Sequence, residues 1–252
     1  MVTRKSKREI EKMRIAGRIV AEVLALVESE LKPGVTTGHL DRLAERHIRS
    51  AGAVPSFKGY GHRSNPFPAS LCISIDDEVV HGIPGERTIR DGQIVSIDAG
   101  EIYDGWHGDG ARTFYVGSAQ PQIGELIDTT RLAMMAGIAA ALPGANLGEI
   151  SGAIEDVARP GEYGIVRQFV GHGIGTEMHQ EPQVPNYRTG ARGMKLAPGI
   201  CLAIEPMLTL GRGDVAVKPD GWTVVTLDGS LAAHFEHTIA VTDNGPEILT
   251  TI

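Results

Sequence analysis

Cysteine is scarce in this sequence of 252 residues, which contains only Cys72 and Cys201. Two cysteines give no disulfide framework, and they fit a reducing compartment. The sequence also lacks an N-terminal apolar segment of the kind that directs secretion, and it lacks a run of about 18 apolar residues that could span a membrane. We therefore expect a cytoplasmic protein that has no contact with a membrane.

Basic residues are fewer than acidic ones, 24 against 31, so the formal net charge is -7 at pH 7. Proteins that bind nucleic acid usually carry a broad basic field, so we expect no direct readout of nucleic acid. The basic cluster TRKSKR at residues 3–8 is interpreted as the solvated start of a helix. A hydrophobic content of 42% and a charged content of 22% are typical of a soluble globular protein that can bury a sizeable core.

Helical periodicity begins close to the N-terminus. Ser6 and Glu9 have the spacing of a capping box, which predicts a helix that ends at Pro33-Gly34. A second helix is predicted from about residue 37 to 51, and a loop rich in Gly, Pro and Ser from about 55 to 68. A hairpin is predicted further along, with strands at 94–102 and 110–116 and a turn at Asp104-Gly105.

Several short patterns occur twice, in the same order, at offsets of 98 to 110 residues. They are Pro33-Gly34 and Pro143-Gly144 before a helix, His81-Gly-Ile-Pro84 and His179-Gln-Glu-Pro182, and two apolar strands that end at Asp98 and Glu205. This repetition predicts one catalytic domain over residues 1–252, made of two pseudo-symmetric halves at about 1–120 and 121–252. The expected fold class is α+β, a duplicated α/β unit with a central, mostly antiparallel sheet covered by helices.

Four carboxylates and one histidine lie within short apolar or glycine-rich stretches. They are Asp98 in IVSIDAG, Asp109 in WHGDGARTF, His172 in FVGHGIG, Glu205 in CLAIEPM and Glu236 in AHFEHTIAV. Burying an unpaired charge costs several kcal/mol, roughly, so such residues need a compensating partner. Convergence on cations supplies one, and the sequence therefore predicts a metal site.

Carboxylate oxygens with one imidazole suit hard or borderline ions such as Mn, Fe(II), Co or Zn. Two such ions about 3.5 to 4 Å apart can share a water, lower its pKa and polarise a carbonyl group. Attack of this bridging hydroxide on an amide needs no protein nucleophile. His81 and His179, matched in the repeat, are expected to flank the metals from opposite sides and to act on the substrate. His107 and His234 precede two of the carboxylates by two residues, so they are candidates to support the ligands.

The combination of SIDAG, HGDGARTF, GHGIG, AIEPM and FEHTIAVT resembles type I methionine aminopeptidases of the bacterial type, which have the pita-bread fold. The resemblance covers nearly the entire chain. It implies that Asp98 chelates one metal, that Asp109 and Glu236 bridge both, and that His172 and Glu205 bind the other. Glu205 would also shuttle protons.

By the same resemblance, His81 and His179 would contact the substrate, and five further residues would accept its methionine side chain. These five are Tyr60, Phe67, Cys72, Met178 and Trp222. A thioether suits a soft aromatic pocket of this kind. The implied function is removal of the initiator methionine from nascent chains whose second residue is small, by a monomer that meets them at the ribosome.

The sequence departs from this family in the stretch GYGHRSNPFPASLC, which is longer than the common GYxxYPxSxC and has Phe67 where tyrosine is frequent. Met178 stands where an aromatic residue is frequent. Two alternatives share the fold. One is a proline-directed aminopeptidase or prolidase, which usually carries an additional N-terminal domain. The other is a non-catalytic binding protein, which typically has lost metal ligands, and here none of the five is missing.

Overall fold

The computed structural model describes residues 2–118 and 120–252. Its helices are α1 (Lys7–Glu30), α2 (Thr37–Ser50), α3 (Pro121–Ala140), α4 (Leu147–Ala158) and a short 3-10 turn at Arg159–Gly161. Its strands are β1 (Val54–Pro55), β2 (Leu71–Ile75), β3 (Glu78–Val80), β4 (Ile94–Tyr103), β5 (Trp106–Tyr115), β6 (Gly164–Ile165), β7 (Gly171–Gly173), β8 (Gln180–Val184), β9 (Cys201–Ile204), β10 (Met207–Thr209), β11 (Val215–Val217), β12 (Val224–Thr226), β13 (Ala232–His234), β14 (Glu236–Thr242) and β15 (Gly245–Ile248).

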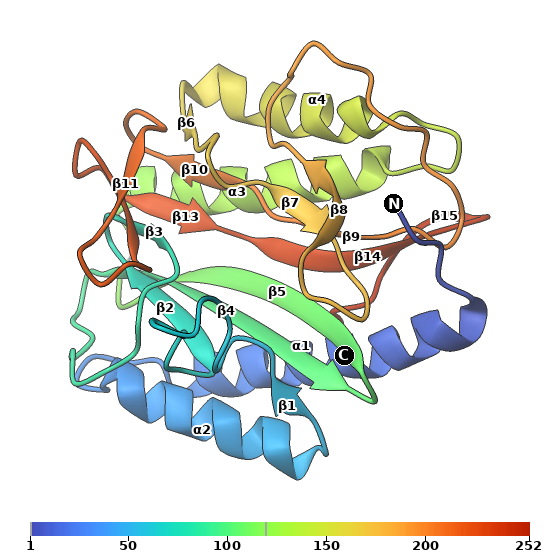
Figure 1. Cartoon of the computed structure of the whole chain (residues 1–252). Coiled ribbons are helices and arrows are strands. Elements are labelled where there is room, and N and C mark those ends of the chain that lie inside the picture. The colour runs from blue at the N-terminus through green and yellow to red at the C-terminus, as the bar shows by residue number, and fades with distance from the viewer. Residues whose placement is uncertain (1, 119) are drawn as a thin grey trace.

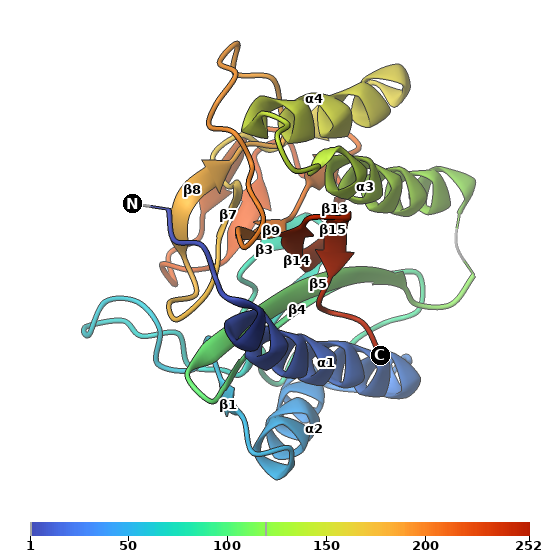
Figure 2. The ribbon, with the colours of Figure 1, turned by 90° about the vertical axis from the view of Figure 1, so that its right-hand side faces the viewer.

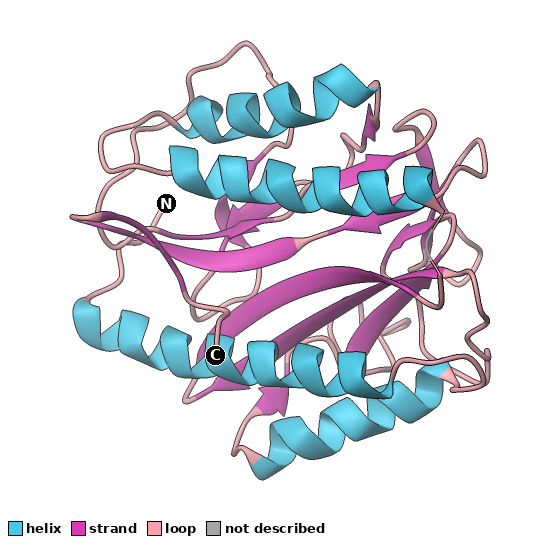
Figure 3. Ribbon diagram, turned by 180° about the vertical axis from the view of Figure 1, so that it is seen from behind, coloured by secondary structure: helices cyan, strands magenta, loops and turns pink. Residues whose placement is uncertain are grey.

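One curved sheet of nine strands organises the molecule, with the central order β1-β4-β5-β14-β9-β7-β8. Strand β2 pairs with β4, and β15 pairs with β14 (Figure 1). Seen from behind, two of the described helices lie above the strands and two below them (Figure 3). The pairings among the described strands are antiparallel. None of the described helices is long and apolar enough to cross a membrane.

Helix α1 begins where the sequence predicts. Ser6 and Glu9 form the expected capping box, in which Glu9 Oε2 accepts the Ser6 N–H at 2.7 Å. The helix then lies directly on the backbone of the sheet, because a Cβ atom added to Gly108 would come within 2.7 Å of the nitrogen of Gly17. Glycine at position 108 permits this approach, which brings α1 close to strands β4 and β5, while glycine at position 17 leaves room for the backbone of Leu249.

The two helix pairs repeat several local features. Thr36 caps α2 by accepting the N–H of His39, and Asn146 caps α4 with a box to Glu149. Each of these cap residues also bridges a later segment, Thr36 to Thr88 and Asn146 to Lys195. The pair α1 and α2 lies below the strands and the pair α3 and α4 above them (Figure 2), and each pair packs on a separate apolar core. The division into halves at residue 120 stays a prediction, and its boundary adjoins residue 119, which lies outside the described residues.

The β4–β5 hairpin aligns two of the predicted ligand positions. Its turn lies at Asp104-Gly105 as predicted, with positive φ angles of 48° and 80°. The predicted start of the second strand at residue 110 is wrong, because β5 already begins at Trp106. Glycines such as Gly108 and Gly110 are typical of loops, but in this strand they lie where α1 packs closely against it. Asp98 pairs with Ala111, and Asp109 pairs with Gly100, so both aspartates face the same side of the hairpin.

Candidate metal centre

Five neighbouring strands bring the five predicted ligands together. Asp98 lies on β4, Asp109 on β5, His172 on β7 and Glu236 at the start of β14, while Glu205 directly follows β9. In the sheet, Ala111 is paired with Asp98 on one side and with Glu236 on the other. Since β14 also pairs with β9, and β9 with β7, segments separated by more than 130 residues meet at one place.

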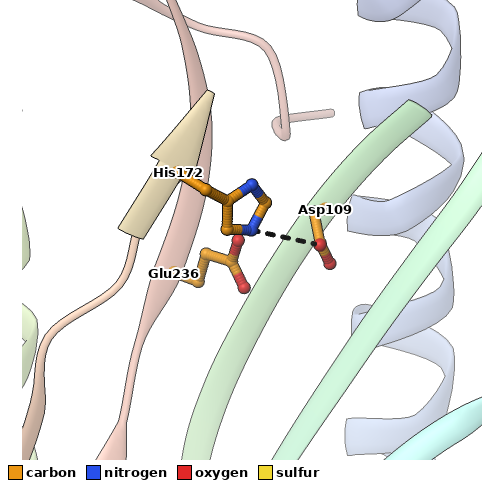
Figure 4. Close-up of side chains that lie close together, drawn as sticks. All are labelled: Asp109, His172 and Glu236. Carbon is orange, nitrogen blue, oxygen red and sulfur yellow. Dashed lines mark ion pairs between the residues drawn. The ribbon is translucent and has the colours of Figure 1, made fainter. Parts of the chain in front are cut away.

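Two groups of three side chains have the geometry of metal ligands. In the first, a ligand atom each from Asp109, His172 and Glu236 lies within 4.8 Å of the others, and Figure 4 shows the three side chains facing one another. The second consists of Glu205, His234 and Glu236. Glu236 belongs to both groups, so it connects them.

Individual distances tie the groups into one cluster. His172 Nε2 lies 3.3 Å from Glu205 Oε1 and 4.0 Å from Asp109 Oδ2. His234 Nε2 lies 3.8 Å from the other oxygen of Glu205. Asp98 is in neither group of three, but it lines the same cavity and is the diagonal neighbour of Asp109 in the hairpin. The structure thus places all five predicted ligands side by side and adds His234 to them.

The carboxylates of this cluster lack compensation from the protein. Burial raises the pKa of Asp98 to about 7, and burial together with the neighbouring carboxylates raises the pKa values of Asp109, Glu205 and Glu236 well above their usual range. Within the described chain, Asp98 Oδ1, Asp109 Oδ1 and Glu236 Oε1 accept no hydrogen bond. Burial also lowers the pKa of His172 to about 3, which keeps its imidazole neutral, as a metal ligand must be. Divalent cations would satisfy these groups, so the donor set fits a metal centre.

Threonine hydroxyls fix the backbone next to two of these side chains. Thr238 Oγ1 accepts the N–H of Asp109 at 3.0 Å and donates to its carbonyl oxygen at 2.8 Å. Thr113 Oγ1 makes the same pair of contacts with His234, at 2.8 and 2.7 Å. Both threonines cross-link strands distant in sequence, and no local pattern marks them, so sequence reasoning missed their contribution.

A cavity of about 80 Å³ opens beside the carboxylates. All the predicted pocket residues line it, together with Phe57, which was not predicted. The ring of Phe67 is 2% exposed and meets Trp222 edge to face, with ring centroids 5.2 Å apart. Phe57 in turn packs edge to face on Phe67 at 6.5 Å. The lining residues are Phe57, Tyr60, Phe67, Cys72, His81, Asp98, Asp109, His172, Met178, His179, Glu205, Trp222 and Glu236.

The two remaining predicted histidines lie at different parts of this cavity. His179 is next to His172, with ring centroids 4.4 Å apart, and its Nδ1 lies 2.6 Å from the hydroxyl oxygen of Tyr60. His81 lies edge-on to Trp222 at 6.4 Å, and burial lowers its pKa to about 4. Neither histidine belongs to a group with ligand geometry. His107, by contrast, is bound to the Ser56 hydroxyl at 2.8 Å.

A buried ion pair connects the strand that precedes His81 to the turn that carries Trp222. Glu78 is 4% exposed and binds Arg87 at 2.9 Å and Lys218 at 2.7 Å. Burial raises the pKa of the Glu78 carboxyl, but the hydrogen bonds from these cations outweigh it and hold the pKa below its usual range. The carboxylate therefore favours the folded state above the pKa of the unfolded chain, and this contribution disappears as the pH falls through the folded pKa.

Replacing Glu78 by glutamine should lower the free energy of unfolding by about 2 kcal/mol at pH 7, because the charge-assisted bonds are lost while both cations stay near solvent. Urea unfolding of both proteins at several pH values measures this difference. It should shrink as the pH falls below the pKa of the unfolded chain and through the lower pKa of the native carboxyl. A difference that is the same at pH 3 and pH 7 would contradict the ion-pair explanation.

The curled antiparallel sheet with buried carboxylates and imidazoles defines a metallohydrolase. Comparison of the sequence with known families agrees: residues 11–243 match metallopeptidase family M24. The chain belongs to this family.

Among curated proteins, the chain is 51% identical over 251 residues to a methionine aminopeptidase of Clostridium acetobutylicum, with 99% of each chain covered. It is 45% identical to methionine aminopeptidase 1 of Bacillus subtilis, with full coverage of both. A methionine aminopeptidase structure from Thermotoga maritima superposes with a TM-score of 0.96 at 42% identity, covering both chains completely. The predicted α+β pita-bread fold and the predicted family are therefore confirmed.

A prolidase from Pyrococcus furiosus shares the fold at a TM-score of 0.78 and 23% identity. The match covers 99% of this chain but 65% of the prolidase chain. Identity at this level shows a common architecture only.

Proposed function

We propose that this chain removes the N-terminal methionine from peptides and nascent proteins, preferring those with a small second residue. The observation that carries the proposal is the position of the aromatic cavity, which lies directly against the buried carboxylate cluster. A side chain held in that cavity places its own peptide bond at the carboxylates. The full-length similarity to methionine aminopeptidases supports the same assignment.

Five side chains would hold the metal: Asp98, Asp109, His172, Glu205 and Glu236. We infer two divalent ions, of Mn, Fe(II), Co or Zn, from the four carboxylates and from the shared position of Glu236. When bound, such ions activate a water and polarise the substrate carbonyl. Glu205, whose two oxygens lie next to His172 and His234, would accept the proton of the attacking water and pass it to the leaving amine.

The histidines outside the ligand set would act on the peptide. His179 is held by Tyr60 and can hydrogen-bond the carbonyl side of the scissile bond, while His81 in the opposite wall can contact its nitrogen. An open groove lined by Thr176, Gln180 and others also includes His172 and His179, which gives the rest of the peptide a path away from the cavity.

The cavity wall would select methionine. An unbranched thioether adapts to a narrow space between aromatic edges, and sulfur–aromatic contacts stabilise it. Phe67, Trp222 and Tyr60 supply the aromatic surface, and Cys72 and Met178, both 4% exposed, complete the wall. A β-branched side chain would not enter as easily, because its rotamers are restricted.

The proposal also includes the surroundings of the reaction. We infer a cytoplasmic monomer that meets nascent chains at the ribosome, and the two buried free cysteines fit a reducing compartment. Sedimentation of the purified protein tests the monomer, and co-sedimentation with translating ribosomes tests the encounter.

Release of methionine from a Met-Ala-Ser peptide tests the function. The protein is first stripped with a chelator, then assayed alone and after addition of Mn, Co or Fe(II), with Met-Leu and Ala-Pro peptides alongside. We expect metal-dependent release from Met-Ala-Ser, at least about 100-fold faster than from Met-Leu. Elemental analysis of the active protein should give two metal ions per chain. Cleavage of Ala-Pro would instead favour a proline-directed peptidase, and inactivity with every metal would favour a binding protein.

A further inference from the structure

The long loop between β1 and β2 folds back on itself beside the cavity. The N–H of Gly59 donates to the carbonyl of Phe67 at 2.8 Å, and the N–H of Phe67 donates to the carbonyl of Tyr60 at 2.8 Å. Residues 61–66 between these bonds are exposed, whereas Phe67 is buried in the cavity wall. The tip of the loop therefore projects from the wall, and within it the N–H of Asn65 donates to the carbonyl of His62 at 2.9 Å.

One residue of this tip binds a second loop. Asn65 Nδ2 donates to the carbonyl oxygen of Asp220 at 3.0 Å, and Trp222 Nε1 donates to the carbonyl oxygen of Asn65 at 3.1 Å. These two reciprocal bonds join segments 155 residues apart and hold the indole of Trp222 by its only polar atom. We call this pair of bonds the Asn65 clamp.

Residues of both loops allow their close contact at the Asn65 clamp. The Asp220 carboxylate accepts the N–H groups of Trp222 and Thr223 at 2.8 and 2.9 Å, which fixes the turn. Gly221 lies against Asn65, since an added Cβ would be 2.7 Å from its side-chain nitrogen. Gly61 lies against the indole, where an added Cβ would be 2.5 Å from the ring. The contact between the two loops is thus too close for larger residues.

We propose that Asn65 is a positioning residue that sets the selectivity of the cavity for methionine. Asn65 does not line the cavity itself and acts through Trp222, whose half-buried ring meets both Phe67 and His81 in the wall. Without the side-chain bond to Asp220, the backbone carbonyl of Asn65 that accepts the indole N–H is no longer held in place, and the wall can widen. The role in selectivity rests on the proposed function, whereas the effect on the indole does not.

Replacing Asn65 by alanine or by aspartate removes the donor to Asp220, and aspartate does so with almost no change in size. The net value of one such hydrogen bond corresponds to about a fivefold change in an equilibrium. We expect KM for Met-Ala-Ser to rise about fivefold in both variants with kcat little changed. The preference for Met-Ala-Ser over Leu-Ala-Ser should fall by a similar factor. Arg63 is the matched control in the same tip, because its side chain makes no hydrogen bond or ion pair with the described residues.

Fluorescence gives a readout that does not depend on catalysis. The chain has two tryptophans, Trp106 and Trp222, so a Trp106→Phe background leaves Trp222 as the sole indole. In that background, both Asn65 variants should shift the emission to longer wavelength and increase quenching by acrylamide, while Arg63→Ala should change neither.

Each outcome decides one claim. Unchanged emission in both Asn65 variants, or the same shift in Arg63→Ala, would overturn the clamp even if methionine release is normal. A shifted emission with unchanged KM and unchanged preference would overturn the role in selectivity. If the parent protein releases no methionine from any peptide, the proposed function fails, and the emission still decides whether Asn65 holds the indole.

Discussion

Replacing Glu205 by glutamine should lower kcat for methionine release by about 10³-fold or more and leave the fold intact. The two oxygens of Glu205 lie 3.3 Å from His172 and 3.8 Å from His234, at the centre of the buried cluster. Glutamine keeps the size of the side chain but loses the charge that would hold a cation and the oxygen that would accept a proton. Steady-state kinetics at saturating Mn and peptide, with circular dichroism of the same samples, measures both effects.

Glu101 provides the matched control for this substitution. It is also a buried carboxylate of the same sheet, with 0% exposure, but it alternates with Asp98 and Gly100 along β4 and so faces the helices. Burial raises the pKa of Glu101 well above its usual range, and its carboxyl lies on the opposite face of β4 from Asp98. Glu101→Gln should change kcat by less than about twofold. Asp98→Asn should behave like Glu205→Gln, and wild-type turnover in either would contradict the metal site.

The ligand positions could be predicted from the sequence because each is a charged or polar residue within an apolar or glycine-rich stretch. Carboxylates such as Asp98 and Glu205 at the ends of apolar strands are costly unless something binds them, and this conflict is visible in a window of seven residues. Helix α1 could also be predicted from the sequence, since a capping box and apolar periodicity are local signals. The position of α1 on the sheet could not be predicted, because the contact of Gly17 with Gly108 joins residues 91 positions apart. Of the two glycines, only Gly108, which lies in a strand, is unusual in its local sequence.

The residues that support the site were harder to predict, because their contacts also join segments that are distant in sequence. Phe57 precedes an exposed loop, and nothing near it indicates that its ring packs on Phe67. His234 was predicted to support the ligands from its spacing to Glu236, and the structure places it beside both Glu236 and Glu205, a second neighbour that the spacing did not indicate. The bond between Tyr60 and His179 spans 119 residues. Such contacts depend on how the loops are arranged in the folded protein, and short-range sequence patterns do not encode this arrangement.

Substitution of His81 should affect turnover far more than metal affinity. His81 lies in the cavity wall and in neither group with ligand geometry, and its neutral ring at pH 7 can hydrogen-bond the peptide. We expect kcat to fall by about 100-fold and the dissociation constant for Mn to change by less than about threefold. Because His81 has a positive φ of 59°, asparagine is a better replacement than alanine, which is strained there.

Calorimetric titration of chelator-stripped protein with Mn, together with peptide kinetics, separates these two effects. His39→Ala is the control, because His39 is exposed on α2, away from the cavity, and should leave both quantities unchanged. Agreement between His81→Asn and His81→Ala would show that the lost imidazole, rather than backbone strain, slows turnover. A collapse of Mn affinity in both variants would mean that His81 is a ligand. The division between side chains that hold the metal and side chains that act on the peptide would then have to be redrawn.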